Sequence, residues 1–547
     1  MSTKLKYSPE ERQLYLLNMF ANVNSGYIPI GLSAKKNMDR LINCTNSIQK
    51  ILENDEIKKT VGTWELVWGP FISCSKMDVS QKDHLAFAKS LAAIKAERNN
   101  LESNTNVEGE QNFKLEDELG FGSTLGFGGL MGNVGNLLNE AAPSEELGEE
   151  NRRRGLYQVT DNTMYVIKCV KQPDDVKDGP DYFIGIAGTN SVSPFGWFKE
   201  DFDVATMKKW EDVLGNFGEK LPQDGGAISK ASWQGLQQLW NMGQEKPVLT
   251  EADKAVGREY GKNETAKKEP LWDFIKSLDT TAKIAISGHS LGGALAPVLA
   301  TVLADKMTAA KMKHTITVLA TAGPTPGDQT FINHLHAKVA NYKAIYNEID
   351  VVPQAWINKD LKAAAAFYPK AYSFDPTKFP LSNNNIIVNR FMEWAGSLAD
   401  NKYARKASNE IPNHAFEIKT WNEGKLEGLP EKKLIGVLNS LSSALALASK
   451  ASKKSFEQIC GRKVTDNEIK EFCAFLIYLG LQHVLAYTGR NGFEVQKAMS
   501  KMTKIVAPFK EKPAGNFLVG YLSLQYILTP LIKTVAKWAA QYQDVTS

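Results

Sequence analysis

The sequence predicts an α/β protein, with a mostly parallel sheet, helices on both of its faces, and helical additions at both ends. Two observations carry this prediction. From about residue 156, short apolar runs typical of buried strands alternate with segments of helical periodicity. After about residue 355 the pattern becomes mainly helical, and no internal repeat is visible. Strands that alternate with helices favour parallel pairing, because each crossover places a helix on a face of the sheet.

The expected elements follow in chain order. The charged segment 1–60 looks helical, residues 63–70 look like a strand that enters a turn, and residues 80–103 look like an amphipathic helix. Buried strands are expected at 163–170, 182–187, 283–287, 315–322 and 343–346, and helices are expected at 229–243 and from about 328.

We divide the chain into a helical N-terminal extension (1–60), an α/β core (61–355) and a mainly helical lobe (356–547). A glycine-rich stretch followed by an acidic run suggests a flexible insertion at about 104–150. No lysine follows those glycines in phosphate-loop register, so we do not expect nucleotide binding. The apolar segment 516–532 fits a buried or surface-docked helix, or one that contacts a membrane.

Composition excludes several classes of protein. The 547 residues are 43% hydrophobic and 23% charged with a net charge of +4, which is typical of a globular protein and implies no nucleic-acid partner. The five cysteines are widely spaced and form no C-x-x-C pair, so neither a disulfide framework nor a metal site is expected. The N-terminus lacks the apolar core of a signal peptide, and no clear transmembrane helix stands out. We expect a cytoplasmic protein or export by a non-classical route, and the oligomeric state stays open.

The segment 283–300 is the most informative stretch, because an apolar strand breaks at Gly-His-Ser-Leu-Gly and a helical run rich in alanine follows at once. This strand–turn–helix context is that of a nucleophile elbow. Gly288 and Gly292 stand where a Cβ would collide with the neighbouring strand or helix. Ser290 would then project at a helix N-terminus, where the backbone N–H of Leu291 can point at an oxyanion.

A serine nucleophile needs a histidine to take its proton and a carboxylate behind that histidine, and the elbow context favours the chain order Ser, acid, His. Asp350 follows the strand 343–346 in a turn that Pro353 helps to fix, and Glu348 is a weaker rival. Two histidines come after this acid, His414 in a loop-like setting and His483 in an apolar helical one. Chain order alone leaves both open as the base.

The second oxyanion donor should come from another strand end, and the strand 182–187 stops at Gly188-Thr189. The N–H of Thr189 can face the oxyanion while its hydroxyl adds a further hydrogen bond. Phe195, Trp197 and Phe198 follow this strand. They fit an apolar lip or lid that contacts acyl chains, or ordinary core packing.

Together these segments resemble the class three (fungal-type) lipase family, which has the α/β-hydrolase fold. The resemblance rests on four groups of residues: Ala187-Gly188-Thr189 with Trp197 and Asp201-Phe202, the G-H-S-L-G-G elbow, Ala322 to Gly327 with Phe331, and Asn347-x-x-Asp350-x-Val352-Pro353. It covers roughly residues 60–70 and 155–490.

The segments at Trp64–Pro70 and Gly185–Asn190 are similar to a larger microbial lipase-like branch. In that branch a late Gln-His-x-x-x-Tyr segment supplies the base, and Gln482, His483 and Tyr487 match it, so the resemblance favours His483 over His414. This sequence departs from the family at Ala187, where arginine is often found. It also places the base 133 positions after the acid (350 to 483), which requires a sizeable insertion.

The resemblance implies a carboxylic ester hydrolase of the triacylglycerol lipase or phospholipase type. Ser290 would be the nucleophile, His483 the base and Asp350 the acid, with Thr189 and Leu291 as the oxyanion hole and no metal or organic cofactor. The implied partner is a lipid ester, and transient contact with a membrane surface stays open. Two alternatives are a non-catalytic lipid- or protein-binding module on a hydrolase fold, and a lipase-type effector or toxin exported without a cleaved signal.

Overall fold

The structure is a computed structural model, which describes residues 8–24, 34–79, 155–190, 203–220, 224–264, 266–368, 385–399, 402–405, 415–416, 453–491, 493–509 and 529–546. Three sequence predictions lie wholly or mostly outside these residues: the helix at 80–103, the glycine-rich insertion at 104–150, and the apolar segment 516–532, of which only the end is described.

One sheet of eight strands organises the molecule, in the order β10-β9-β8-β7-β3-β2-β1-β6. Its strands are β1 (Thr63–Val79), β2 (Gly155–Lys171), β3 (Tyr182–Ile186), β6 (Glu259–Lys262), β7 (Lys283–His289), β8 (Thr315–Thr321), β9 (Asn341–Asn347) and β10 (Ala415–Phe416). The strands from β10 to β3 pair in parallel, and β2, β1 and β6 extend the sheet by antiparallel pairing. The predicted α/β-hydrolase type of fold, a mostly parallel sheet with helices on both faces, is confirmed.

The side chains of the strands alternate between two hydrophobic cores, one on each face of the sheet. In β3, Phe183 packs on one face of the sheet, while Ile184 and Ile186 pack on the other. Successive side chains of a strand point to opposite faces, so a strand buried on both sides must be apolar throughout. This explains why these strands read as short, almost continuous apolar runs in the sequence.

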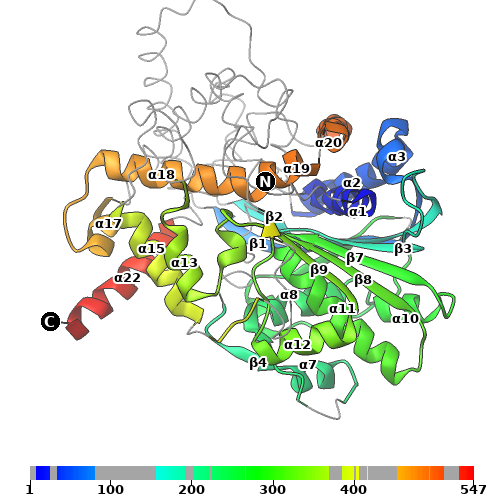
Figure 1. Cartoon of the computed structure of the whole chain (residues 1–547), viewed down its shortest axis with the longest axis horizontal. Coiled ribbons are helices and arrows are strands. Elements are labelled where there is room, and N and C mark those ends of the chain that lie inside the picture. Colours follow the sequence, from blue (N-terminus) through cyan, green and yellow to red (C-terminus); the bar gives the residue numbers. More distant parts are fainter. Residues whose placement is uncertain are drawn as a thin grey trace, which may run out of the picture.

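One face of the sheet is covered by helices from the middle of the chain (Figure 1). They are α7 (Trp210–Asn216), α8 (Lys230–Asn241), α10 (Leu271–Lys276), α11 (Leu291–Ala309) and α12 (Gln329–Lys338). The short elements β4 (Met207–Lys209), β5 (Ala227–Ser229) and α9 (Glu251–Ala255) lie in the same region of the chain. The helix α11, which follows the predicted elbow, is almost entirely buried.

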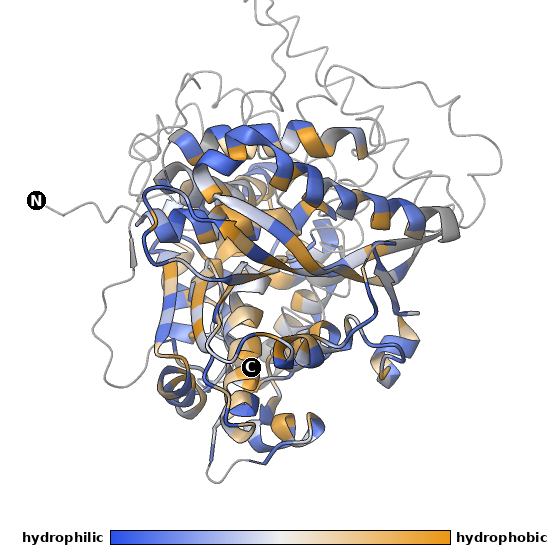
Figure 2. Ribbon diagram, turned by 90° about the vertical axis from the view of Figure 1, so that its right-hand side faces the viewer, coloured by the Kyte–Doolittle hydropathy of each residue, from blue (hydrophilic) through white to orange (hydrophobic). Residues whose placement is uncertain are grey.

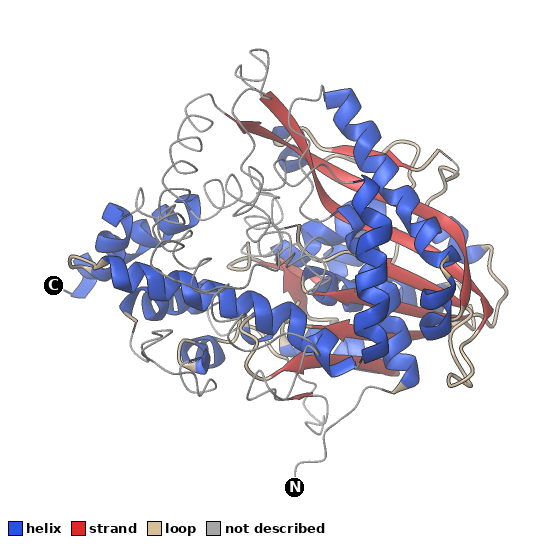
Figure 3. Cartoon of the chain, turned by 90° about the horizontal axis from the view of Figure 1, so that it is seen from above, coloured by secondary structure: helices blue, strands red, loops and turns tan. Residues whose placement is uncertain are grey.

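The other face is covered by helices from the two ends of the chain (Figure 1). From the N-terminal side come α1 (Pro9–Met19), the 3-10 helix η1 (Phe20–Asn24), α2 (Ala34–Glu53) and α3 (Asp55–Val61); from the C-terminal side come α18 (Asp466–Gly480), a π-helical turn (Leu481–Leu485), α19 (Ala486–Asn491) and α20 (Phe493–Val506). Seen from above, the helices lie across the strands, with a second helical group beside the sheet (Figure 3). That group contains α13 (Asn358–Ala364), α15 (Ile386–Ala399), α17 (Lys453–Cys460) and α22 (Thr529–Thr546).

The two ends of the chain meet on this face. The hydroxyl groups of Tyr15 in α1 and Thr488 in α19 are 2.8 Å apart in a buried hydrogen bond. Residues of both ends share one hydrophobic core with the sheet, and polar and apolar residues alternate along the ribbons of helices and strands (Figure 2). The predicted N-terminal extension therefore packs on the sheet, and the division at residues 60 and 355 stays a prediction.

One helical stretch among the described residues, Asp466–Thr488, is long and apolar enough to cross a membrane by length and composition. In this structure 80% of its apolar window is buried inside the protein. Its side chains Phe472, Phe475 and Tyr478 belong to the core that also contains α1 and the sheet.

The turn expected at residues 69–70 is wrong. β1 runs through Gly69 and Pro70 and continues to Val79, paired with β2 along its length. The pairing register shifts on both sides of Trp68, between Leu66 and Trp68 and between Trp68 and Phe71, and the second shift spans Gly69 and Pro70. Gly and Pro usually end a strand, but a β-bulge allows the strand to continue past them. The Gly-Pro pair therefore marks an irregular point in the hydrogen bonding between β1 and β2, not a turn.

Candidate active site

The nucleophile candidate Ser290 lies on a sharp turn between β7 and α11. Its backbone has φ of 61° and ψ of −125°, outside the conformations that residues with a side chain usually adopt. The Ser290 N–H donates to the carbonyl oxygen of Thr321 at 3.0 Å, which ties the turn to the end of β8. Strain of this kind persists where the surrounding structure enforces it, and it is common at active sites.

The glycines around Ser290 make the turn sterically feasible. A Cβ on Gly288 would lie 1.9 Å from the carbonyl oxygen of Gly292, and a Cβ on Gly292 would lie 2.5 Å from the carbonyl oxygen of Ile186 in β3. Both contacts are with backbone atoms, which cannot move aside cheaply. The glycine spacing read from the sequence therefore has the expected steric cause.

The acid candidate Asp350 follows β9 and is fully buried. Its Oδ1 accepts a hydrogen bond from the backbone N–H of Val352 at 3.0 Å. Its Oδ2 accepts from His483 Nδ1 and from the hydroxyl of Tyr487, both at 2.9 Å. Three hydrogen-bond donors therefore surround this one buried carboxyl group and fix its orientation. Glu348, the rival considered from the sequence, is exposed.

His483 lies in the π-helical turn between α18 and α19, and turns of this kind are frequent at functional sites. With Nδ1–H donating to Asp350, the neutral ring keeps a lone pair on Nε2, the atom that a general base uses. Nε2 is buried and has no hydrogen-bond partner within the described residues. The hydroxyl of Ser290 is thus not bonded to it here, as is common in enzymes without substrate.

His483 nevertheless stands beside the elbow. Its ring centroid is 5.0 Å from that of His289, the residue that precedes Ser290. The structure thus brings Asp350 and His483 into direct contact and places the histidine ring next to the turn that carries Ser290.

Two further contacts fasten the helix of His483 to the loop of Asp350. The side-chain oxygen of Gln482 accepts a hydrogen bond from the Asn347 side-chain amide at 2.7 Å. The Tyr487 hydroxyl accepts the backbone N–H of Asn347 at 2.8 Å while it donates to Asp350. The whole Gln-His-x-x-x-Tyr segment, and not the histidine alone, therefore holds the acid.

His289 packs behind the elbow and is almost fully buried. Thr321 donates its hydroxyl proton to the Gly288 carbonyl oxygen, so its oxygen accepts from His289 Nδ1, at 3.0 Å. Burial, and next the charge of a protonated His483, lower the pKa of His289 well below its usual value. His289 therefore stays neutral beside the candidate base.

The oxyanion-hole candidates lie on two different elements next to Ser290. Thr189 follows β3, and a Cβ on the preceding Gly188 would be 3.3 Å from the Cβ of Ser290. Leu291 is the first residue of α11, where a backbone N–H has no acceptor within the helix. The helix dipole adds a positive potential at this position. An oxyanion formed on the ester bound to Ser290 would lie between these two elements.

Four candidate residues fall outside the described residues of the chain. They are the alternative base His414 and the aromatic residues of the proposed lip or lid, Phe195, Trp197 and Phe198. Within the described residues, no group of three or more His, Cys, Asp or Glu side chains could hold a metal ion.

Sequence reasoning missed a pair of buried asparagines, Asn18 at the end of α1 and Asn22 in η1. The side-chain oxygen of Asn22 accepts the backbone N–H of Gly188 at 2.9 Å. Asn18, with its amide oriented so that donors meet acceptors, bonds to both β3 and β7. Their spacing of four positions within an apolar helical run was the available signal, since buried polar groups require partners.

Comparison with known proteins identifies the central segment of the chain. Residues 232–359, which include the elbow and Asp350, match the family described as Lipase (class 3). No curated protein matches the sequence. Among solved structures, the M37 lipase aligns at 19% identity with a TM-score of 0.42, covering 86% of this chain and 98% of its own. The Lip2 lipase from Yarrowia lipolytica aligns at 17% identity with a TM-score of 0.24, covering 36% of this chain and 56% of its own.

Proposed function

We propose that this chain, whose residues 232–359 match the class 3 lipase family, cleaves lipid carboxylic esters through an acyl-enzyme on Ser290. One observation carries the proposal. The 2.9 Å contact between His483 Nδ1 and the buried Asp350 carboxylate lies beside a serine on a strained strand–helix turn. Serine acyl transfer requires a serine hydroxyl as nucleophile and a histidine base supported by a carboxylate.

In the first half of the reaction, the Ser290 hydroxyl oxygen attacks the ester carbonyl carbon while His483 Nε2 takes its proton. The imidazolium formed in this step is stabilised by Asp350, which already accepts its Nδ1–H. The negative charge that develops on the carbonyl oxygen is held by the backbone N–H groups of Thr189 and Leu291. His483 then gives its proton to the departing alcohol oxygen, and the acyl group stays on Ser290.

In the second half, water enters and His483 takes one of its protons as the oxygen attacks the acyl carbon. The same two amides hold the second oxyanion. When this intermediate collapses, the proton on His483 returns to Ser290 and the fatty acid leaves. The protein supplies the base, the acid and the two oxyanion donors from four separate regions of the chain.

The proposed substrate is a lipid ester with an apolar acyl chain. Within that class we infer either acylglycerols or phospholipids. The alternative of a non-catalytic module predicts a triad member out of reach or a plugged pocket. The hydrogen bond between His483 and Asp350 supports hydrolysis over this alternative.

The nucleophile is tested by Ser290→Ala, which removes the attacking oxygen. We expect release of fatty acid from a short-chain p-nitrophenyl ester to fall by about 10⁴- to 10⁶-fold, as is typical of triad knockouts. Ser287→Ala is the matched control, because Ser287 lies in β7 just before the turn and donates its hydroxyl to the Leu319 carbonyl at 2.8 Å. Activity of Ser290→Ala equal to that of the control would sink the serine-hydrolase proposal. Parallel assays on triacylglycerol emulsions and phospholipid vesicles then assign the substrate.

The base is tested by comparing His483→Ala with His414→Ala. We expect only His483→Ala to match the loss seen for Ser290→Ala, because its ring is hydrogen-bonded to Asp350. A full loss in His414→Ala together with near-normal activity in His483→Ala would reverse the assignment.

A further inference from the structure

We propose that Asn22 is a positioning residue for the oxyanion-binding segment, so that the N-terminal helix belongs to the catalytic centre. This inference rests on the proposed function of Ser290 and Thr189. Asn22 lies outside the segment that matches the lipase family and more than 160 positions before Thr189. Its side chain is 2% exposed and its amide oxygen accepts the backbone N–H of Gly188, the residue next to Thr189.

The need for such an acceptor arises from the elbow. The parallel pairing of β3 with β7 ends at Ile186 and Gly288, because β7 then turns into Ser290. Beyond this point β7 offers no carbonyl oxygen to accept a hydrogen bond from the N–H of Gly188. A buried backbone N–H without an acceptor is costly, and Asn22 supplies the missing carbonyl oxygen at 2.9 Å.

Asn18 has the corresponding role one helical turn earlier. Its amide nitrogen donates to the carbonyl oxygens of Ile186 (2.9 Å) and Ser287 (3.0 Å), and its oxygen accepts the N–H of His289 (2.9 Å). The two asparagines therefore replace the ladder hydrogen bonds where β3 and β7 separate. Asn18 lies at the end of α1 and Asn22 lies in η1, which follows without a break, so one continuous helical segment serves both strand ends.

The chemistry of Asn22 also favours a role in positioning. Its nitrogen Nδ2 is buried without a hydrogen-bond partner among the described residues of the chain, so only the bond to Gly188 holds the amide there. Gly188 itself has no side chain to fix its conformation, and a Cβ there would lie 2.8 Å from the His289 carbonyl oxygen. The anchor on its N–H therefore fixes the direction in which the next amide, that of Thr189, points.

Loss of this anchor should impair the transition state more than substrate binding, because the oxyanion forms only during reaction. For Asn22→Ala we expect kcat to fall by about 10- to 100-fold, with KM within about threefold of the wild-type value. We also expect a boronic acid inhibitor, which mimics the tetrahedral oxyanion, to lose affinity by a similar factor.

Asn24→Ala is the matched control, because Asn24 is 1% exposed, belongs to the same 3-10 helix and has no partner for either side-chain amide atom within the described residues. We expect its kcat to stay within about twofold of wild type. Hydrogen–deuterium exchange of the segment 182–190, followed by mass spectrometry, should be faster in Asn22→Ala than in Asn24→Ala.

If Asn22→Ala does not fold, Asn22→Ser takes its place. Serine keeps an uncharged acceptor, but its side chain is too short to reach the Gly188 N–H as the asparagine amide does. For this variant we expect a kcat loss of at least threefold with unchanged KM. Normal kcat, normal inhibitor affinity and normal exchange in a folded Asn22 variant would overturn the inference. Wild-type protein that shows no Ser290-dependent hydrolysis would instead overturn the proposed function, and the exchange experiment would still report whether Asn22 fixes Gly188.

Discussion

At the scale of single residues, the hydroxyl of Tyr487 connects the acid to its own loop. It donates to Asp350 Oδ2 and accepts the Asn347 N–H. Tyr487→Phe removes both bonds but retains the ring. We expect kcat/KM to fall about tenfold, equivalent to about 1.4 kcal/mol of transition-state stabilisation, because the carboxylate that supports His483 loses a donor. Steady-state kinetics on the p-nitrophenyl ester measure this effect.

Tyr403→Phe serves as the comparison for that variant. Its hydroxyl is also buried and donates to a backbone carbonyl, that of Val204 at 2.5 Å, in a hydrophobic cluster separate from the one that contains Tyr487. We expect it to lose stability without loss of kcat/KM. Equal losses of kcat/KM in the two variants would contradict a specific role for the Tyr487 hydroxyl.

His289 makes stability depend on pH. Burial lowers its pKa in the folded protein well below the value of about 6.5 expected for the unfolded chain. As the pH falls below about 6.5, the unfolded state takes up a proton that the folded state does not, so the free energy of unfolding decreases. His289→Asn should remove up to about 1.4 kcal/mol of this dependence per pH unit.

Urea unfolding of both proteins between pH 8 and pH 5 tests this linkage. Near the upper end of that range the histidine is neutral in both states, so the difference between wild type and variant should be constant. Towards the lower end the advantage of the wild type should shrink as the pH falls. If the free energies of unfolding of wild type and variant change with pH in parallel over the whole range, His289 does not titrate differently in the folded and unfolded states.

At the scale of elements, the parallel strands could be predicted because each is a short apolar run buried on both faces. The run at 283–287 lies within β7, and the run at 315–322 matches β8. The elements between residues 203 and 276 escaped prediction, because they are three to seven residues long apart from α8 and leave little periodicity to detect. β1 was cut short for a different reason, since a local Gly-Pro signal was overridden by pairing with β2.

The residues of the candidate site also fall into two groups, those that the sequence pattern indicates and those that only the fold brings together. Ser290 and Asp350 follow strands, so local pattern and chain order indicate both of them. His483 and Asn22 come from helices at opposite ends of the chain, and only the folded sheet brings them to the elbow. Neither chain order nor spacing contains that information, so chain order left His414 and His483 both open as the base. The family resemblance favoured His483, and its hydrogen bond to Asp350 supports that choice.

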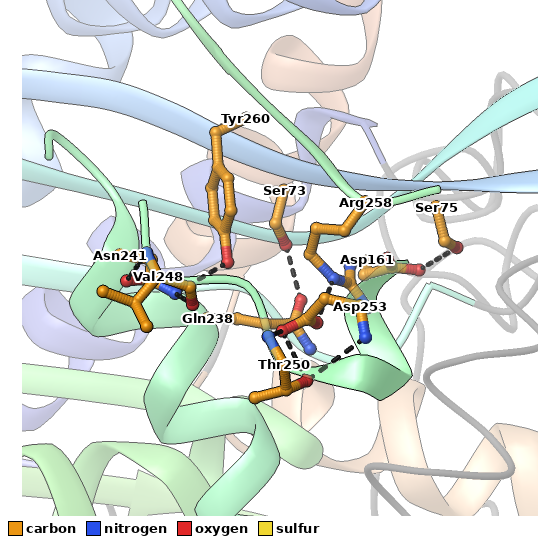
Figure 4. A network of polar contacts seen from close by, with 10 residues as sticks. All are labelled: Ser73, Ser75, Asp161, Gln238, Asn241, Val248, Thr250, Asp253, Arg258 and Tyr260. Atoms are coloured by element: carbon orange, nitrogen blue, oxygen red, sulfur yellow. Dashed lines mark hydrogen bonds and ion pairs between the residues drawn. The ribbon is translucent and has the colours of Figure 1, made fainter. Parts of the chain in front are cut away.

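At the scale of the whole molecule, the sheet has a parallel part and an antiparallel part. The parallel strands end at the candidate site, while the antiparallel strands β2, β1 and β6 form an arm held by a buried polar network (Figure 4). At its centre the guanidinium group of Arg258 contacts the carboxylates of Asp161 and, at 2.8 Å, Asp253. Ser75 on β1 donates to the Asp161 carboxylate at 2.9 Å, which ties the network to the sheet.

Arg258→Met tests what this network contributes. The variant leaves two buried carboxylates without their cation, so we expect a loss of roughly 3–5 kcal/mol in the free energy of unfolding. Some of that loss should be regained as the pH falls, because protonated carboxyl groups carry no charge to bury.

Arg12→Met is the comparison, since Arg12 pairs with Asp175 at the surface and should contribute at most about 1 kcal/mol. Urea midpoints measure both variants, and kcat of the folded Arg258→Met protein should stay near wild type. A midpoint of Arg258→Met equal to that of Arg12→Met would show that the arm does not depend on this network.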